Sequence, residues 1–168
     1  MSRRRVCVVT SGLPAPGEPM AARAAEMHAA GAEVTLLRAT AFPAETPLPL
    51  WQARLPFRLD SAFASDDPAD AAFETWLWLR DAPPFDAIHF AAAGGAGYWL
   101  TVARRCGLAF PGTPLVCHLA DAPTAAPLLH DLRQIERDFL ERRSAEGADA
   151  VTGPGRPGWA LPARRWRG

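Results

Sequence analysis

Short apolar runs alternate with longer mixed segments along this chain of 168 residues. Continuous apolar runs with β-branched residues predict strands that are buried on both faces, as in a parallel sheet. The segments between the runs favour helices by propensity or by the helical spacing of their apolar residues. The predicted strands are 6–9, 32–37, 86–92, 113–119 and 148–152, and 51–59 has room for one more. The predicted helices are 20–30, 69–80, 98–106 and a long one that begins near residue 128.

Two of the predicted helices carry apolar residues on one face. In the helix over 69–80 this face holds Ala69, Phe73, Trp76 and Leu77. In the long helix the stacked apolar residues are Leu128, Leu132, Ile135 and Phe139. A face of this kind is the side of a helix that packs on a core.

The opening of the chain predicts the topology. The strand over 6–9 is followed by a loop over 11–19, which holds two Gly and three Pro. A helix, the capping Gly31 and a second strand come next. This βαβ order implies a parallel sheet with a right-handed crossover. Because the alternation continues without an internal repeat, we expect an α/β fold, a Rossmann-like doubly wound parallel sheet of five or six strands.

We expect a single domain over 1–157, followed by a tail over 158–168. The interior strands of its sheet should hold five β-branched residues. These residues are Val8, Val34, Ile88, Val116 and Val151.

Composition adds mainly exclusions. The 18 basic residues are balanced by 18 acidic ones, so there is no electrostatic case for a nucleic-acid partner. Cys7, Cys106 and Cys117 lie far apart without a CxxC pair, which argues against a disulfide framework or a metal site. The first residues hold too short an apolar run for a signal peptide or a membrane span. We therefore expect a cytoplasmic protein.

Four segments resemble consecutive parts of one known family. The first is 6–37, with its strand, loop, helix and second strand. The others are FDAIHF at 85–90, GAGYWLTVARRCGLAF at 95–110 and DFLERRSAEGADAV at 138–151. In this order they resemble the N-terminal, acceptor-side domain of the family-4 retaining glycosyltransferases, which have the GT-B fold. The resemblance covers nearly the whole chain.

The resemblance implies that this domain binds the acceptor, while a C-terminal domain holds a nucleotide-sugar donor. Neither the family's donor-binding glycine-rich region nor its pair of acidic residues occurs in these 168 residues. We therefore expect a truncated or split glycosyltransferase, an acceptor-binding half that binds no cofactor itself. It should be inactive without a donor-binding domain or subunit, because the donor domain supplies most of the transition-state stabilisation.

The resemblance places candidate acceptor-binding glycines in two loops. Gly12 and Gly17 lie in the loop after the first strand, where the family has a glycine-rich loop. Glu18 brings a negative charge to that loop and Pro19 removes a donor, so a plain connecting loop fits equally well. The second pair, Gly95 and Gly97, precedes the helix over 98–106, where close packing is an alternative role.

The resemblance places candidate catalytic residues after the strand over 113–119. The family has a sugar-contacting His there, and His118 lies one or two residues early. Asp121 could offer a carboxylate to an acceptor hydroxyl. A purely structural role competes for His118, and a hydrogen-bonded structural role is expected for His89.

Two other classes of function stay open. A non-catalytic Rossmann-like binding or scaffold domain fits the three alanines at 91–93, where the family has polar residues. A nucleotide-dependent Rossmann enzyme is disfavoured, because no GxGxxG motif follows the first strand. A half-enzyme should also expose Trp159, Leu161 and Trp166 towards its partner, or self-associate through them.

Overall fold

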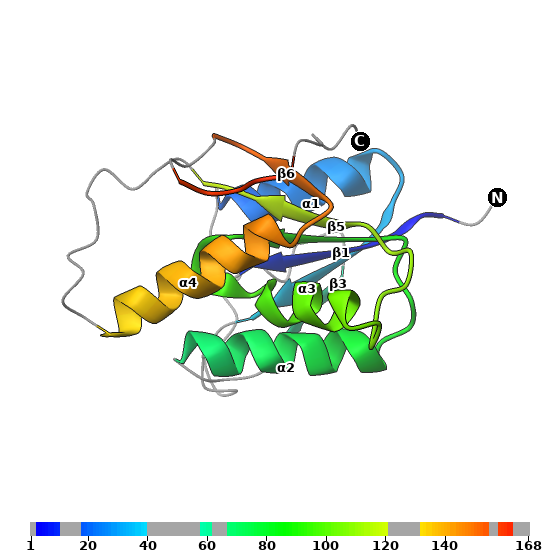
Figure 1. The fold of residues 1–168 in the computed structure, drawn as a ribbon. Coiled ribbons are helices and arrows are strands. Elements are labelled where there is room, and N and C mark those ends of the chain that lie inside the picture. Colours follow the sequence, from blue (N-terminus) through cyan, green and yellow to red (C-terminus); the bar gives the residue numbers. More distant parts are fainter. Residues whose placement is uncertain are drawn as a thin grey trace, which may run out of the picture.

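The computed structural model describes residues 3–10, 18–39, 58–61, 67–120, 132–154 and 158–162. These residues form one parallel sheet with helices on both faces (Figure 1). Several predictions fall on residues outside the described ranges and stay predictions. These residues are Gly12, Gly17, Asp121, Leu128 and Trp166.

The sheet has six parallel strands in the order β3-β2-β1-β4-β5-β6. Their bounds are β1 Arg5–Thr10, β2 Glu33–Arg38, β3 Arg58–Ser61, β4 Ala87–Ala91, β5 Leu115–His118 and β6 Ala150–Thr152. The chain builds outward from β1 to β3 and then crosses back to place β4 on the other side of β1. Because this is the order of a doubly wound Rossmann sheet, the predicted fold class is confirmed.

Four of the five predicted interior residues lie on interior strands, and one prediction is wrong. Val151 is buried, but it lies on β6, which is an edge strand of the sheet. The extra strand expected within 51–59 is β3, which begins at Arg58, near the end of that window.

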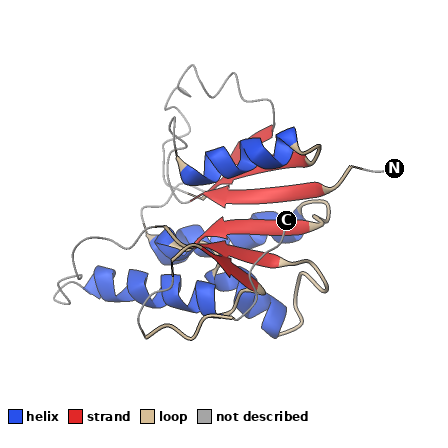
Figure 2. Ribbon diagram, turned by 90° about the horizontal axis from the view of Figure 1, so that it is seen from above, coloured by secondary structure: helices blue, strands red, loops and turns tan. Residues whose placement is uncertain are grey.

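The main helices are α1 Pro19–Ala29, α2 Pro68–Asp81, α3 Tyr98–Arg105 and α4 Leu132–Glu146, and a short 3₁₀ turn, η2, spans Ala93–Gly95. Helix α1 packs on β1 and β2, on one face of the sheet. The other three helices pack against one another on the opposite face (Figure 2). No helix among the described residues is both long and apolar enough to cross a membrane.

The alternation of side chains along β1 divides the core in two. Val6 and Val8 pack with Met20 of α1 in one cluster. Cys7 and Val9 belong to the larger cluster on the opposite face of the sheet. Residues of β1 are therefore buried on both faces, as its continuous apolar run predicts.

The predicted apolar face of α2 is only partly buried. Trp76 packs against the larger core cluster, whereas Phe73 is 38% exposed. The fully buried residues of this helix are Ala71, Ala72, Thr75 and Leu79, which the predicted face did not include.

The predicted buried stripe of α4 is also wrong where it is described. Leu132, Ile135 and Phe139 are 83%, 43% and 47% exposed. Only the C-terminal half of α4 packs on the core, through Leu140 and Ala145. The leading half extends past the ends of the strands, so its apolar stripe has no sheet beneath it (Figures 1 and 2).

Candidate functional site

The strand order places a switch point between β1 and β4. In open parallel sheets, ligands bind at the carboxyl ends of the strands beside such a point. The four nearest strands, β2, β1, β4 and β5, end at Arg38, Thr10, Ala91 and His118, and β6 beyond them ends at Thr152. We therefore build the candidate site from this edge of the sheet.

A chain of hydrogen bonds joins three strands at this edge. His89 Nδ1 lies 2.9 Å from His118 Nε2, and His118 Nδ1 lies 2.6 Å from Thr152 Oγ1. The two imidazole rings stack with centroids 5.2 Å apart. The register explains this contact, because Ala91 pairs with His118 and His89 lies two residues earlier on the same face of the sheet.

The imidazoles of His89 and His118 are both neutral at physiological pH. Burial is the main cause that lowers the pKa of His89 to about 3, and electrostatic repulsion from His118, Arg4 and Arg23 adds to it. Burial is also the main cause that lowers the pKa of His118 to about 4, with Arg23 adding to it. These shifts follow from the cost of placing a cation in a poorly solvated environment.

Two arrangements of the protons are compatible with the hydrogen bonds among His89, His118 and Thr152. Thr152 Oγ1 can donate to His118 Nδ1, in which case His118 Nε2–H donates to His89 Nδ1. In the reverse arrangement His89 Nδ1–H donates to His118 Nε2, and His118 Nδ1–H donates to Thr152. These three hydrogen-bonded side chains can therefore offer a ligand a donor or an acceptor while they carry no net charge.

At this edge, the N-terminus of α1 is capped by the carboxylate of Glu18. Glu18 is the N-cap of α1, and its Oε2 accepts the Ala21 N–H at 2.7 Å. Thr10 Oγ1 donates to the other oxygen of Glu18 at 3.3 Å. Pro19 at the first helical position has no N–H to offer. A ligand anion would therefore meet a carboxylate where helix N-termini usually bind phosphate.

In the loop between β4 and α3, a carboxylate of the protein likewise accepts a backbone N–H. The Gly94 N–H donates to Glu141 Oε1 of α4 at 2.9 Å. Gly95 has a positive φ of 68°, and a Cβ there would lie 2.4 Å from the Leu140 Cβ. A Cβ on Gly97 would lie 2.2 Å from the Phe90 ring. Close packing therefore accounts for both glycines, and their role in acceptor binding stays a prediction.

The sequence-predicted residues are only partly brought together. His118 lies in the site, and the hydrogen-bonded role expected for His89 is confirmed, with His118 as its partner. Sequence reasoning missed Thr152 and Glu141. The alignment of the ends of β5 and β6 could have suggested Thr152, whereas nothing local marks Glu141.

The sequence predicts Asp149 only as a turn residue at the end of the long helix, and the structure gives it further contacts before β6. Its carboxylate accepts the Leu115 N–H at 2.7 Å and forms an ion pair with Arg104. Arg104 also donates to the Thr113 carbonyl at 2.7 Å. This contact ties α3 and β6 to the start of β5, so its role is structural.

Among the described residues, no group of three or more His, Cys, Asp or Glu side chains is placed to hold a metal ion. In comparison with known proteins, the sequence matches no protein-family model, and no curated protein matches it significantly.

Proposed function

We propose that this chain is the acceptor-binding half of a GT-B glycosyltransferase, with the acceptor bound at the carboxyl edge beside β1 and β4. One observation carries the proposal. A neutral hydrogen-bonded chain, His89–His118–Thr152, lies at this edge, and the nearby anion positions are held by Glu18 and Glu141.

This arrangement fits a hydroxyl-bearing ligand better than a phosphate. A hydroxyl both donates and accepts, so it matches the chain in either proton arrangement. A phosphate needs unpaired N–H groups or cations, and Glu18 already accepts the Ala21 N–H. The Glu18 carboxylate would also repel the phosphate. These contacts disfavour a nucleotide at this edge and favour an acceptor alcohol.

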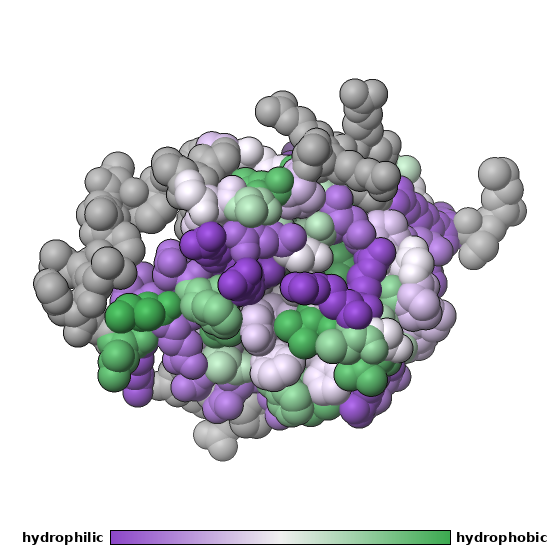
Figure 3. Space-filling model, in the orientation of Figure 1, coloured by the Kyte–Doolittle hydropathy of each residue, from purple (hydrophilic) through white to green (hydrophobic). Residues whose placement is uncertain are grey.

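The exposed apolar residues of α4 are suited to contact with a donor-binding domain. Leu132 and Ile135 are exposed in the N-terminal half of α4, and this half extends past the carboxyl ends of the strands (Figure 1). Apolar surface gathers at this end of the helix (left in Figure 3). Exposed apolar patches of this kind mark interaction sites. The donor-binding domain of a GT-B enzyme faces this side of its acceptor-binding half.

A non-catalytic binding or scaffold domain is the second candidate. Trp159 and Leu161 pack against the larger core cluster of this chain instead of projecting from it. Ala91 ends β4, where the resemblance leads one to expect a polar side chain. Both observations favour a self-contained domain without chemistry.

Calorimetric titration with UDP-glucose tests the absence of a donor site. The isolated chain should bind no tighter than about 1 mM, which corresponds to about 4 kcal/mol. Exchanging both carboxylates in the double variant Glu18→Gln/Glu141→Gln should strengthen the binding of UDP, because the repulsion is removed. Micromolar binding of UDP-glucose to the wild type would contradict the proposal.

Nuclear magnetic resonance tests the acceptor side. Adding maltose or myo-inositol should shift the imidazole resonances of His118, and Thr152→Val should weaken that shift. Glu136→Gln, an exchange on an exposed part of α4, serves as the matched control and should change nothing. If saturating polyol leaves the His118 resonances in place, the edge does not bind hydroxyl-bearing ligands and the scaffold reading stands.

A further inference from the structure

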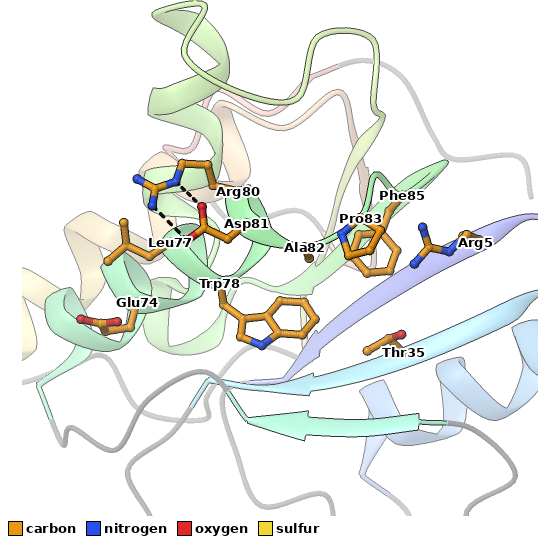
Figure 4. Close-up of a pocket in the computed structure, with 10 residues that line it drawn as sticks. All are labelled: Arg5, Thr35, Glu74, Leu77, Trp78, Arg80, Asp81, Ala82, Pro83 and Phe85. Carbon is orange, nitrogen blue, oxygen red and sulfur yellow. Dashed lines mark hydrogen bonds and ion pairs between the residues drawn. The ribbon is translucent and has the colours of Figure 1, made fainter.

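A cavity of about 520 Å³ lies at the edge of the sheet opposite the histidine pair (Figure 4). Helix α2 forms one side of it through its C-terminal half, and Thr35 of β2 lies across from that helix. Arg5, the first residue of β1, closes one end. A volume of this size is typical of sites that take small molecules.

Aromatic rings build part of the wall. Trp78 stacks on Phe85 with centroids 6.4 Å apart and planes 20° from parallel. The Arg5 guanidinium lies over the Phe85 ring at 5.1 Å. Since Arg5 covers Phe85, the indole of Trp78 is the main aromatic surface that a ligand can contact (Figure 4).

Most charged groups around the cavity already have partners. Arg80 Nε and Nη2 donate to the two carboxylate oxygens of Asp81 at 2.7 and 3.0 Å. Arg5 donates from Nη1 to the Pro84 carbonyl at 2.8 Å, and its Nε lies 3.6 Å from Glu33. These guanidinium groups are therefore engaged before any ligand arrives.

Three polar side chains that line the cavity make no hydrogen bond within the described part of the chain. They are the carboxylate of Glu74, the indole N–H of Trp78 and the hydroxyl of Thr35. Thr35 is only 8% exposed, so its hydroxyl has little access to solvent other than through the cavity. The indole N–H is a donor and the Thr35 hydroxyl both donates and accepts, whereas the Glu74 carboxylate points away from the indole (Figure 4).

We propose that this cavity is a second binding site, for an uncharged, ring-shaped polyhydroxylated molecule such as a sugar or a cyclic polyol. The C–H face of the ring would stack on Trp78. Its hydroxyls would exchange hydrogen bonds with the Thr35 hydroxyl and accept from the indole N–H. This site is distinct from the acceptor site at the carboxyl edge and does not depend on it.

Charge argues against the other ligand classes. Arg80 forms an ion pair with Asp81, and Arg5 forms one with Glu33. The polar groups beside the indole, the Thr35 hydroxyl and the indole N–H itself, carry no charge. They therefore match the hydroxyls of an uncharged ligand and give an ion no opposite charge to pair with.

Titration of ¹⁵N-labelled protein with maltose and with myo-inositol tests this proposal. The Nε1–H resonance of Trp78, assigned by its loss in Trp78→Phe, should shift and saturate at about millimolar ligand. Thr35→Val should weaken the binding about fivefold, because it removes a hydroxyl that hydrogen-bonds the ligand and keeps the shape of the side chain. Glu136→Gln on α4 is the matched control and should bind like the wild type.

Three outcomes would overturn the proposal. The first is that neither polyol moves the Trp78 resonance. The second is that Thr35→Val binds like the wild type, and the third is that choline binds more tightly than either polyol, which would make this a cation site. Because the acceptor site is read from His118 and this cavity from Trp78, the failure of one proposal is distinguishable from the failure of the other.

Discussion

Acid should destabilise this domain through its histidine pair. His89 is 1% exposed and His118 is half-buried, and burial lowers their pKa values to about 3 and about 4. In the unfolded chain both would titrate near 6.5. As the pH falls through 6.5, the unfolded state takes up protons that the folded state cannot bind. The stability present above pH 6.5 is therefore lost progressively towards pH 4 and then 3.

The size of the effect follows from the same linkage. A histidine with an unfolded pKa of 6.5 that stays neutral when folded costs about 2 kcal/mol of stability between pH 7 and pH 5. The pair should therefore cost about 4 kcal/mol over that window. This loss is a large fraction of the free energy of unfolding of a typical domain, which is roughly 5–15 kcal/mol. Most carboxylates titrate below pH 5. The histidines therefore cause most of the stability loss between pH 7 and pH 5.

Urea unfolding followed by circular dichroism at pH 7, 6 and 5 measures this loss. In His118→Gln the loss between pH 7 and pH 5 should fall to about 2 kcal/mol, since only His89 then contributes. Thr152→Val is the control, because it deletes a hydrogen-bond partner of His118 and no histidine. It should lower the stability at pH 7 by about 1 kcal/mol and keep the full loss on acidification.

Two results would refute this reasoning. A wild-type loss below about 1 kcal/mol between pH 7 and pH 5 would mean that the pair is not buried and neutral in the folded state. An unchanged loss in His118→Gln would assign the acid sensitivity to other groups.

Three further predictions concern packing. Asp149→Ala should lower the free energy of unfolding by about 1–3 kcal/mol in urea melts, because the N–H of the buried Leu115 loses its acceptor; an unchanged midpoint would contradict this. Gly97→Ala should cost about 1–3 kcal/mol, because the new Cβ overlaps the Phe90 ring, and thermal unfolding measures it. If α4 mediates self-association, Leu132→Ser/Ile135→Ser should raise the monomer fraction in sedimentation without lowering Tm, and a wild type that is already monomeric would exclude that role.

The sequence by itself determined the class of fold. Apolar runs such as 6–9 and 86–92 are buried on both faces only in a covered parallel sheet, and the βαβ opening permits essentially one hand of crossover. The end of the first helix was also predictable, because Gly31 adopts a positive φ that favours glycine after a helix. These features depend on local chemistry, which the sequence carries in full.

Tertiary structure alone decided which helix faces are buried and which polar groups meet. Phe73 and Leu132 have apolar side chains at helical spacing, yet both are exposed. Other residues of α2 occupy its buried face, and the leading half of α4 extends past the ends of the strands (Figure 1). His89 and His118 stand 29 residues apart and meet only through the register of β4 and β5. Burial and pairing depend on what lies across a contact, and the neighbours along the chain do not specify it.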